Sequence, residues 1–159
     1  MNIYLIRHGE AEKIEMGKKD FDRELTAAGR NKFRNAAEHW KNIIPSFDYI
    51  ITSPLIRALQ TAQILGDVFG YSKEIITDKK ISPGGNTEAL VEIANSLEGE
   101  EIVFVGHQPD FAEHLSKLLS REEILVEFKK GTIAKVSFNN KVRLSKGMLE
   151  FLIPAGIFK

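Results

Sequence analysis

Residues 2–10, Asn2-Ile3-Tyr4-Leu5-Ile6-Arg7-His8-Gly9-Glu10, decide the fold of this chain. Residues 3–6 form a continuous apolar run, as in a strand that is buried on both faces. The run ends at Arg7 and His8, and Gly9 then permits a sharp change of direction. An Arg-His pair alone would also fit a strand that leaves the core into solvent. In open α/β sheets, however, the carboxyl ends of the strands form the edge at which ligands bind.

The length and composition fit one globular domain that covers residues 1–159. Apolar residues make up 43% of the chain and charged residues 28%, which argues against disorder. The 22 Lys and Arg residues balance 22 Asp and Glu residues, so we expect neither a nucleic-acid surface nor a membrane surface. Without cysteine the chain has no disulfide, thiolate metal site or thiol nucleophile. No apolar run has the length of a signal peptide core or a membrane span, and we expect a cytoplasmic protein.

Strand-like and helix-like segments alternate along the chain. Strands are expected at residues 3–6, 47–52, 74–77 and 101–105. Helices are expected at residues 26–44, at 87–97 and from Pro109 onward, and another runs from Ser53 as its N-cap to Gly70 as its C-cap. This alternation predicts right-handed crossovers and a three-layer α/β/α sandwich around a mostly parallel sheet.

The C-terminal part of the chain follows a different pattern. Residues 132–138 and 148–153 alternate as strands do, and Asn139-Asn140 suggests a hairpin turn between them. They predict antiparallel pairing at one edge of the sheet. Residues 121–130 fit either a short helix or a strand, and the polar residues 11–25 are expected to be a long connection outside the core.

Two further basic residues follow predicted strands. Arg57 falls in or just after the first turn of its helix, where free N–H groups and the helix dipole attract anions. A guanidinium there is unfavourable to the dipole, so an anion should lie beside it, although an ordinary surface ion pair would also fit. His107 lies between the strand at 101–105 and the next helix.

Arg7, His8, Arg57 and His107 should converge, because the C-termini of parallel strands share one edge. Two guanidiniums and two imidazoles, without a cluster of Cys or Asp, suit a compact dianion such as phosphate. No metal is expected, since two fixed positive charges oppose a cation and neighbouring carboxylates are missing. The remaining histidines are expected to be structural, one at a helix surface and one within a helix: His39 and His114.

Three motifs now resemble those of one family. Arg7-His8-Gly9-Glu10, residues 53–61 (Ser-Pro-Leu-Ile-Arg-Ala-Leu-Gln-Thr) and Gly106-His107-Gln108-Pro109 resemble, in order and spacing, motifs of the histidine phosphatase superfamily, which has the phosphoglycerate-mutase-like fold. Residues 25–29, Leu-Thr-Ala-Ala-Gly, are similar to the family's first-helix motif. The short chain, the Ser-Pro-Gly-Gly-Asn segment at 82–86 and the brief tail look most like the phosphohistidine phosphatases of the SixA type.

The resemblance implies a phosphatase without a cofactor, in which His8 attacks phosphorus in line and is transiently phosphorylated. It implies that Arg7, Arg57 and His107 bind the three equatorial oxygens and stabilise their charge in the transition state. The backbone N–H of Gln108 would add a phosphate contact. His8 must present a neutral nitrogen, so we expect its other nitrogen to donate to a backbone carbonyl.

One departure from the family pattern bears on the substrate. Larger relatives that act on phosphate esters carry a carboxylic acid after the third strand, whereas residues 81–86 have none and Glu88 is already in the predicted helix. Loss of such a proton donor costs roughly 10²–10⁴ in rate for an alkoxide leaving group. The imidazole released from phosphohistidine can instead be protonated by solvent on its second nitrogen.

The expected substrate is therefore a protein that carries phosphohistidine, which the short links after the strands would leave room to admit. Two alternatives stay open. One is a phosphatase of small phosphomonoesters, with Glu88 or an acid from residues 10–22 as the proton donor. The other is a phosphate-binding module without turnover.

Overall fold

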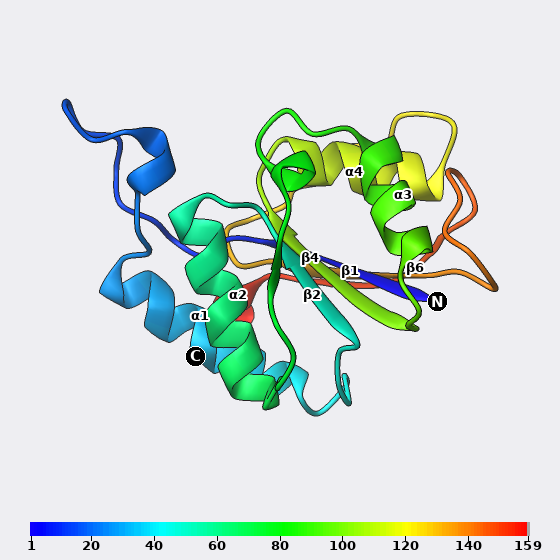
Figure 1. The fold of residues 1–159 in the computed structure, drawn as a ribbon, viewed down its shortest axis with the longest axis horizontal. Coiled ribbons are helices and arrows are strands. Elements are labelled where there is room, and N and C mark those ends of the chain that lie inside the picture. The colour runs from blue at the N-terminus through cyan, green and yellow to red at the C-terminus, as the bar shows by residue number, and fades with distance from the viewer. Residues whose placement is uncertain (159) are drawn as a thin grey trace.

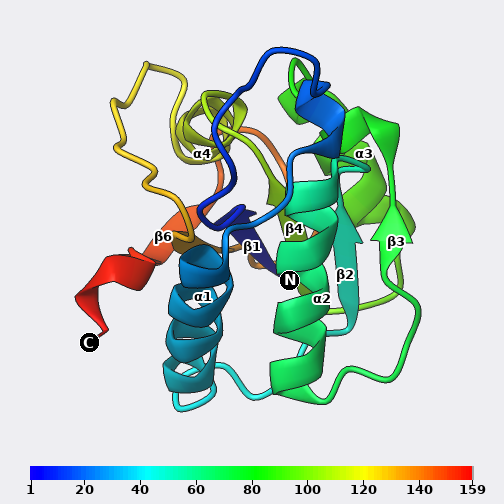
Figure 2. The same cartoon turned by 90° about the vertical axis from the view of Figure 1, so that its left-hand side faces the viewer.

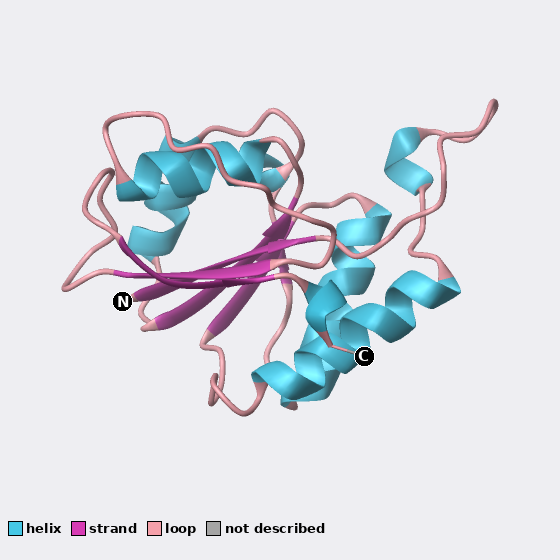
Figure 3. Cartoon of the chain, turned by 180° about the vertical axis from the view of Figure 1, so that it is seen from behind, coloured by secondary structure: helices cyan, strands magenta, loops and turns pink. Residues whose placement is uncertain are grey.

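The computed structural model describes residues 1–158. A six-stranded sheet in the order β3-β2-β4-β1-β5-β6 lies between two layers of helices (Figures 1 and 3). The strands are β1 (Asn2–Arg7), β2 (Tyr49–Thr52), β3 (Ile76–Thr77), β4 (Glu101–Gly106), β5 (Ile133–Ser137) and β6 (Met148–Ile153). The pairs β3–β2, β2–β4 and β4–β1 are parallel, whereas β1–β5 and β5–β6 are antiparallel. The predicted α/β class and the antiparallel pairing near the C-terminus are confirmed.

Helices cover both faces of the sheet (Figure 1). They are α1 (Ala27–Trp40) and α2 (Ile56–Phe69) on one face, and α3 (Thr87–Ser96) and α4 (Asp110–Leu119) on the other, with short 3-10 helices η1 (Asp20–Asp22), η2 (Lys79–Ile81) and η3 (Ala155–Ile157). Within residues 1–158, no helix combines the length and the apolar character needed to cross a membrane.

Strand β1 is apolar throughout because it feeds two separate cores. Tyr4 and Ile6 pack with α1 and α2, while Ile3 and Leu5 pack with α3 and α4. Successive side chains of a strand point to opposite faces, so a strand between two helical layers must be apolar at every position. This burial fixes the position of Arg7 at its end.

Helix α1 begins as predicted but ends earlier. The Thr26 side chain caps it by accepting a hydrogen bond from Gly29 N at 2.9 Å. The last turn tightens at Trp40, whose carbonyl accepts from the N–H groups of both Ile43 and Ile44. Ile44 is buried, but Ile43, which the period of the predicted helix would place on its apolar face, is 53% exposed.

The structure differs from four other predictions. Helix α2 has its N-cap at Leu55 rather than Ser53, because the Ser53 hydroxyl accepts from Leu55 N and forms a local turn first. Gly70 is the C-cap, as predicted, with φ of 63°. Strand β3 is shorter than predicted, and residues 121–130 form neither a helix nor a strand. Residues 138–147 join β5 to β6, so Asn139-Asn140 is not a tight hairpin turn.

The connection at residues 11–25 contributes more structure than we predicted. Its ends are buried and paired, because Ala11 and Leu25 form an isolated antiparallel bridge. Its middle contains η1. The start of α1 packs closely against Glu10, and a Cβ at Gly29 would lie only 2.2 Å from the carbonyl oxygen of that residue.

Two helical glycines should therefore respond oppositely to alanine. Gly29→Ala forces a steric clash with Glu10 and should lower the free energy of unfolding by about 1–3 kcal/mol. Gly66→Ala is the matched control in α2: its Cβ would meet Ile75 at an ordinary 3.6 Å, so higher helix propensity should stabilise the fold by about 0.5–1 kcal/mol. Urea unfolding measures both changes. An unchanged free energy of unfolding in Gly29→Ala would contradict the close packing.

Candidate active site

The structure brings the four predicted basic residues together at one sheet edge. Figure 2 looks onto the edge where β1 ends, beside the starts of α1 and α2. Arg7 is the last residue of β1 and pairs in register with Gly106 at the end of β4, so His8 and His107 follow two adjacent strands. Their ring centroids lie 5.3 Å apart. Arg57 reaches the same point from the first turn of α2.

Hydrogen bonds fix the orientation and the tautomer of His8. Its Nδ1 lies 2.7 Å from the carbonyl oxygen of Gly9. A carbonyl only accepts, so Nδ1 carries the proton, as predicted, and Nε2 keeps its lone pair. The Nε–H of Arg57 donates to this Nε2 at 3.3 Å. The lone pair of His8 Nε2 therefore accepts from a cationic donor, and His8 is 7% exposed.

Both imidazoles are held in the neutral form. Burial lowers the pKa of His8 to about 3, and the charges of His107, Arg57 and Arg7 act in the same direction against the hydrogen bond to Gly9. Burial and Arg57 lower the pKa of His107 to about 4, although Asp20 opposes the shift. At neutral pH the ring of His8 is therefore available as a nucleophile.

We expect the rings of His8 and His107 to stay neutral between pH 8 and 5. Their pKa values in the folded protein lie below the ordinary 6.5. Between pH 6.5 and these lowered values, the unfolded chain therefore binds more protons than the folded protein does. The contribution of the neutral rings to stability is therefore complete above about pH 6.5 and declines as the pH falls towards 4 and then 3. An NMR titration of the imidazole protons, assigned with His8→Gln and His107→Gln, tests this. A midpoint near 6.5 for either ring would contradict it.

Asp20 is a residue of the site that the sequence analysis included only in the range 10–22 of possible proton donors, without predicting its contact with Arg57. Its carbonyl oxygen accepts from Arg57 Nη1 at 2.8 Å and its Oδ2 from Nη2 at 3.0 Å, so η1 covers one side of the site. The short links were expected to leave the site open, but η1 lies against Arg57 on this side. The requirement for an anion beside Arg57 at the helix N-terminus was the signal that could have located Asp20.

The contact with Asp20 leaves one edge of Arg57 for a ligand. Asp20 occupies the Nη1–Nη2 end of the guanidinium, while the Nε–H is directed at His8. Hydrogen bonds from Arg23 and then Arg57 lower the pKa of the Asp20 carboxyl. Asp20 is thus ionised at neutral pH and orients Arg57 without blocking its Nε edge.

Two buried nitrogens of the site have no partner within residues 1–158. They are Nε of Arg7 and Nδ1 of His107. The other contacts of these residues are fixed: Arg7 Nη1 donates to the carbonyl of Phe128 at 2.8 Å, and His107 Nε2 lies 2.8 Å from the Ser53 hydroxyl. The Ser53 hydroxyl accepts from Leu55 N and can donate to Nε2 of His107, which makes Nδ1 the protonated nitrogen. Buried donors without partners are costly, so this arrangement fits a group that brings several acceptor oxygens.

The remaining predicted residues lie as follows. Gln108 is half-buried, and its side-chain oxygen accepts from Ala112 N at 3.3 Å, which keeps the side chain on α4. Glu88 lies in the first turn of α3, where its charge acts to raise the pKa values of His114 and Lys117.

His39 and His114 lie outside the cluster, as predicted. His39 is exposed and stacks on Phe158 with ring centroids 4.6 Å apart. His114 is buried, and its Nδ1 lies 2.9 Å from the hydroxyl of Thr87 at the start of α3. Within residues 1–158, no group of three or more His, Asp or Glu side chains is arranged to hold a metal ion.

Thr61 links the segment after β1 to the start of α2. Its buried hydroxyl accepts from Gly9 N at 3.1 Å and donates to the carbonyl of Arg57 at 2.7 Å. Thr61→Val keeps the shape but leaves the Gly9 N–H unsatisfied, and it should lower the free energy of unfolding by about 1–3 kcal/mol and also reduce kcat. Urea unfolding and steady-state kinetics measure the two effects. The exposed Thr77→Val is the control, and equal effects of both variants would argue against the link.

Sequence comparison places this geometry in a known class. A model of the histidine phosphatase superfamily (branch 1) matches residues 3–82, which contain both the His8 and the Arg57 motifs. The chain belongs to this superfamily, and this membership supports phosphatase activity.

Individual relatives include the SixA-type proteins. The chain is 28% identical over 146 residues to a phosphohistidine phosphatase SixA homologue of Haemophilus influenzae, covering 86% of this chain and 87% of the relative. It is 33% identical over 117 residues to an uncharacterised protein of Picosynechococcus sp., covering 71% and 70% of the two chains.

The fold is shared with solved SixA structures. The protein histidine phosphatase SixA complexed with tungstate superposes with a TM-score of 0.87 over 100% of both chains at 21% identity. A putative phosphohistidine phosphatase SixA from Agrobacterium tumefaciens superposes with a TM-score of 0.81 over 96% of both chains at 24% identity.

Proposed function

We propose that the protein is a metal-independent phosphatase that hydrolyses phosphohistidine in proteins through a phosphorylated His8. One observation carries the proposal: the neutral Nε2 of a buried histidine faces the Nε–H of Arg57 among donors that lack partners. A phosphoryl group bound to Nε2 would replace this hydrogen bond, and its oxygens would supply acceptors for the Nε–H of Arg57 and for the buried nitrogens that lack partners. Phosphoryl transfer depends mainly on such positioning and on electrostatic stabilisation.

The reaction would run in two steps. In the first, Nε2 of His8 forms a bond to phosphorus while the bond from phosphorus to the substrate nitrogen breaks, and the imidazole that leaves takes a proton from water. Arg7, Arg57 and His107 would hold the equatorial oxygens, and the backbone N–H of Gln108 would add a contact. In the second step, water attacks phosphorus, releases inorganic phosphate and returns His8 to its neutral form.

The acids near the site favour a P–N bond as the substrate bond. The pKa of Asp20 is lowered by Arg23 and Arg57, so Asp20 is a poor proton donor. An alkoxide would leave without a proton, whereas an imidazole leaves readily. The similarity to the Haemophilus influenzae relative, which is described as a phosphohistidine phosphatase homologue, supports the same substrate bond. We infer that the partner is a phosphorylated protein.

A panel of phosphorylated substrates, each assayed with and without EDTA, tests the proposal. We expect phosphohistidine peptides to be hydrolysed faster than phosphoserine peptides and sugar phosphates by at least about 10²-fold, unchanged by EDTA. Comparable rates on a sugar phosphate that fall in Asp20→Asn would favour the ester phosphatase. Phosphate binding without turnover of any substrate would favour a binding module, and loss of activity in EDTA that a divalent metal restores would contradict metal independence.

A further inference from the structure

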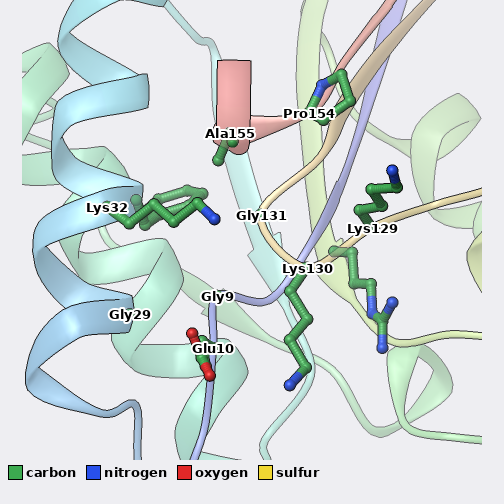
Figure 4. A pocket seen from close by; sticks show the side chains of 12 residues that line it. Gly9, Glu10, Gly29, Lys32, Lys129, Lys130, Gly131, Pro154 and Ala155 are labelled. Atoms are coloured by element: carbon green, nitrogen blue, oxygen red, sulfur yellow. The ribbon is translucent and has the colours of Figure 1, made fainter. Parts of the chain in front are cut away.

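A cavity of about 290 Å³ adjoins residues 7–10, between α1, η3 and the segment before β5 (Figure 4). Four of its lining side chains are cationic, Arg7, Lys32, Lys129 and Lys130, and one, Glu10, is a carboxylate. We call this cavity the lysine pocket. Charges balance over the whole chain, so the surplus of positive charge here is a local feature.

The charges of the lysine pocket are not consumed by neighbouring carboxylates. Within the described part of the chain, Lys32 and Lys130 form no ion pair, and Lys129 pairs with Glu127 at 3.4 Å where both side chains are exposed. Such exposed pairs are weak. The Lys32 side chain lies over η3, its Nζ 3.4 Å from the position that a Cβ on Gly156 would take, and it is directed at the segment of Gly131 (Figure 4).

The lysine pocket is also tied to the catalytic pair. The N–H of Gly131, directly after the two lysines, is shared between the carbonyls of Arg7 and His8 at 3.1 Å each. Gly131 has φ of 72°, which glycine adopts without strain. Arg7 lines the pocket, and its Nη1 donates to the carbonyl of Phe128 in the same segment. The position of the lysine pocket relative to His8 is therefore fixed by backbone hydrogen bonds.

We propose that the lysine pocket is a second anion subsite, which holds an acidic group of the substrate while the phosphoryl group lies at His8. The proposal rests on the proposed function for the phosphoryl site. Lysine ammonium groups on flexible stems bind a carboxylate or a phosphate as point charges, without demanding one geometry. In a phosphorylated protein the group would be an Asp or Glu side chain near the phosphohistidine. A second phosphate on a small molecule has the same chemistry.

The test compares substrates with and without the second acidic group. Short phosphohistidine peptides carry one Asp at successive positions around the phosphohistidine, and matched peptides carry Asn there. Phosphoramidate supplies a P–N bond without a second anion, and a small bisphosphate is compared with its monophosphate. The protein variants are Lys32→Gln/Lys130→Gln and the control Lys141→Gln, an exposed lysine between β5 and β6, near the opposite end of β1.

We expect the double variant to raise KM for the best Asp peptide about tenfold, with kcat nearly unchanged, and to leave the Asn peptides and phosphoramidate unaffected. Added salt should weaken the preference for Asp in the wild-type protein. If the double variant raised KM only for the bisphosphate, a small molecule would be identified as the source of the second acidic group. Equal kinetics of the double variant and Lys141→Gln on every substrate would overturn the proposal.

A binding measurement separates failure of the subsite from failure of the phosphohistidine proposal. Unphosphorylated Asp and Asn peptides are added to the full chain, and the amide NMR signals of Gly131 and Gly156 are followed. Shifts with the Asp peptide alone, lost in the double variant, support the subsite even if no phosphohistidine peptide is hydrolysed. Turnover of phosphohistidine without these shifts and without a lysine effect on KM would leave the proposed function standing and reject the subsite.

Discussion

Turnover is expected to fall by about 10⁴-fold or more in His8→Ala, because covalent catalysis loses its nucleophile. No other imidazole can take over. Nε2 of His107 is hydrogen-bonded to the Ser53 hydroxyl, which leaves Nδ1 as the protonated nitrogen without a lone pair, and His39 and His114 lie on helices outside the cluster. Phosphate binding should persist through Arg7 and Arg57. Steady-state kinetics with a phosphohistidine peptide measure the loss, and phosphate titration measures the binding.

The covalent intermediate gives a second, independent measurement. Quenching during turnover without acid, followed by mass spectrometry, should place the phosphoryl label on the peptide that contains His8. His39→Ala is the control, since its ring is exposed and stacks on Phe158, and it should retain full activity. Label on His107, or substantial activity in His8→Ala, would show that the nucleophile has been assigned wrongly.

Arg57→Ala is expected to lower kcat/KM by about 10³-fold. The guanidinium is 5% exposed and directs its Nε–H at His8 Nε2, so its charge acts on the transferring phosphoryl group with little screening by water. Arg57→Lys keeps the charge but not the planar fork held by Asp20, and it should recover only part of the activity. Arg34→Ala is the control, an exposed arginine on α1 that pairs with Asp67 at 3.5 Å.

The same substitution should leave the fold intact. Loss of the two hydrogen bonds to Asp20 is offset by relief of repulsion among the clustered cations, so we expect the free energy of unfolding to change by less than about 2 kcal/mol. Arg57 lowers the pKa of both His8 and His107, so both pKa values should rise in Arg57→Ala. Hydrogen exchange should increase at residues 12–25. A variant that unfolds, or one with normal kinetics, would show that Arg57 has a structural role instead.

The strands, the helices and the convergence of the four basic residues could be predicted from the sequence. Apolar periodicity reports which faces are buried, and crossover connections make the strands parallel, so that their C-termini lie at one edge. Arg7 and His8 at the end of β1, and His107 after β4, followed from these two rules. Boundaries were less predictable, as at Ile43 and Ser53, because a local turn or a competing hydrogen bond ends or delays a helix without changing its pattern.

Other parts of the site were decided by the tertiary structure. Asp20 meets Arg57 because η1 folds back from a segment whose sequence has no periodicity. Thr61 joins Gly9 to α2 through one hydroxyl, and Gly131 ties the lysine pocket to the carbonyls of Arg7 and His8. The sequence by itself determined which residues lie at the edge, since periodicity and chain topology are encoded locally. Only the tertiary structure decided how those residues are oriented and neutralised, because these contacts join irregular segments far apart in the chain.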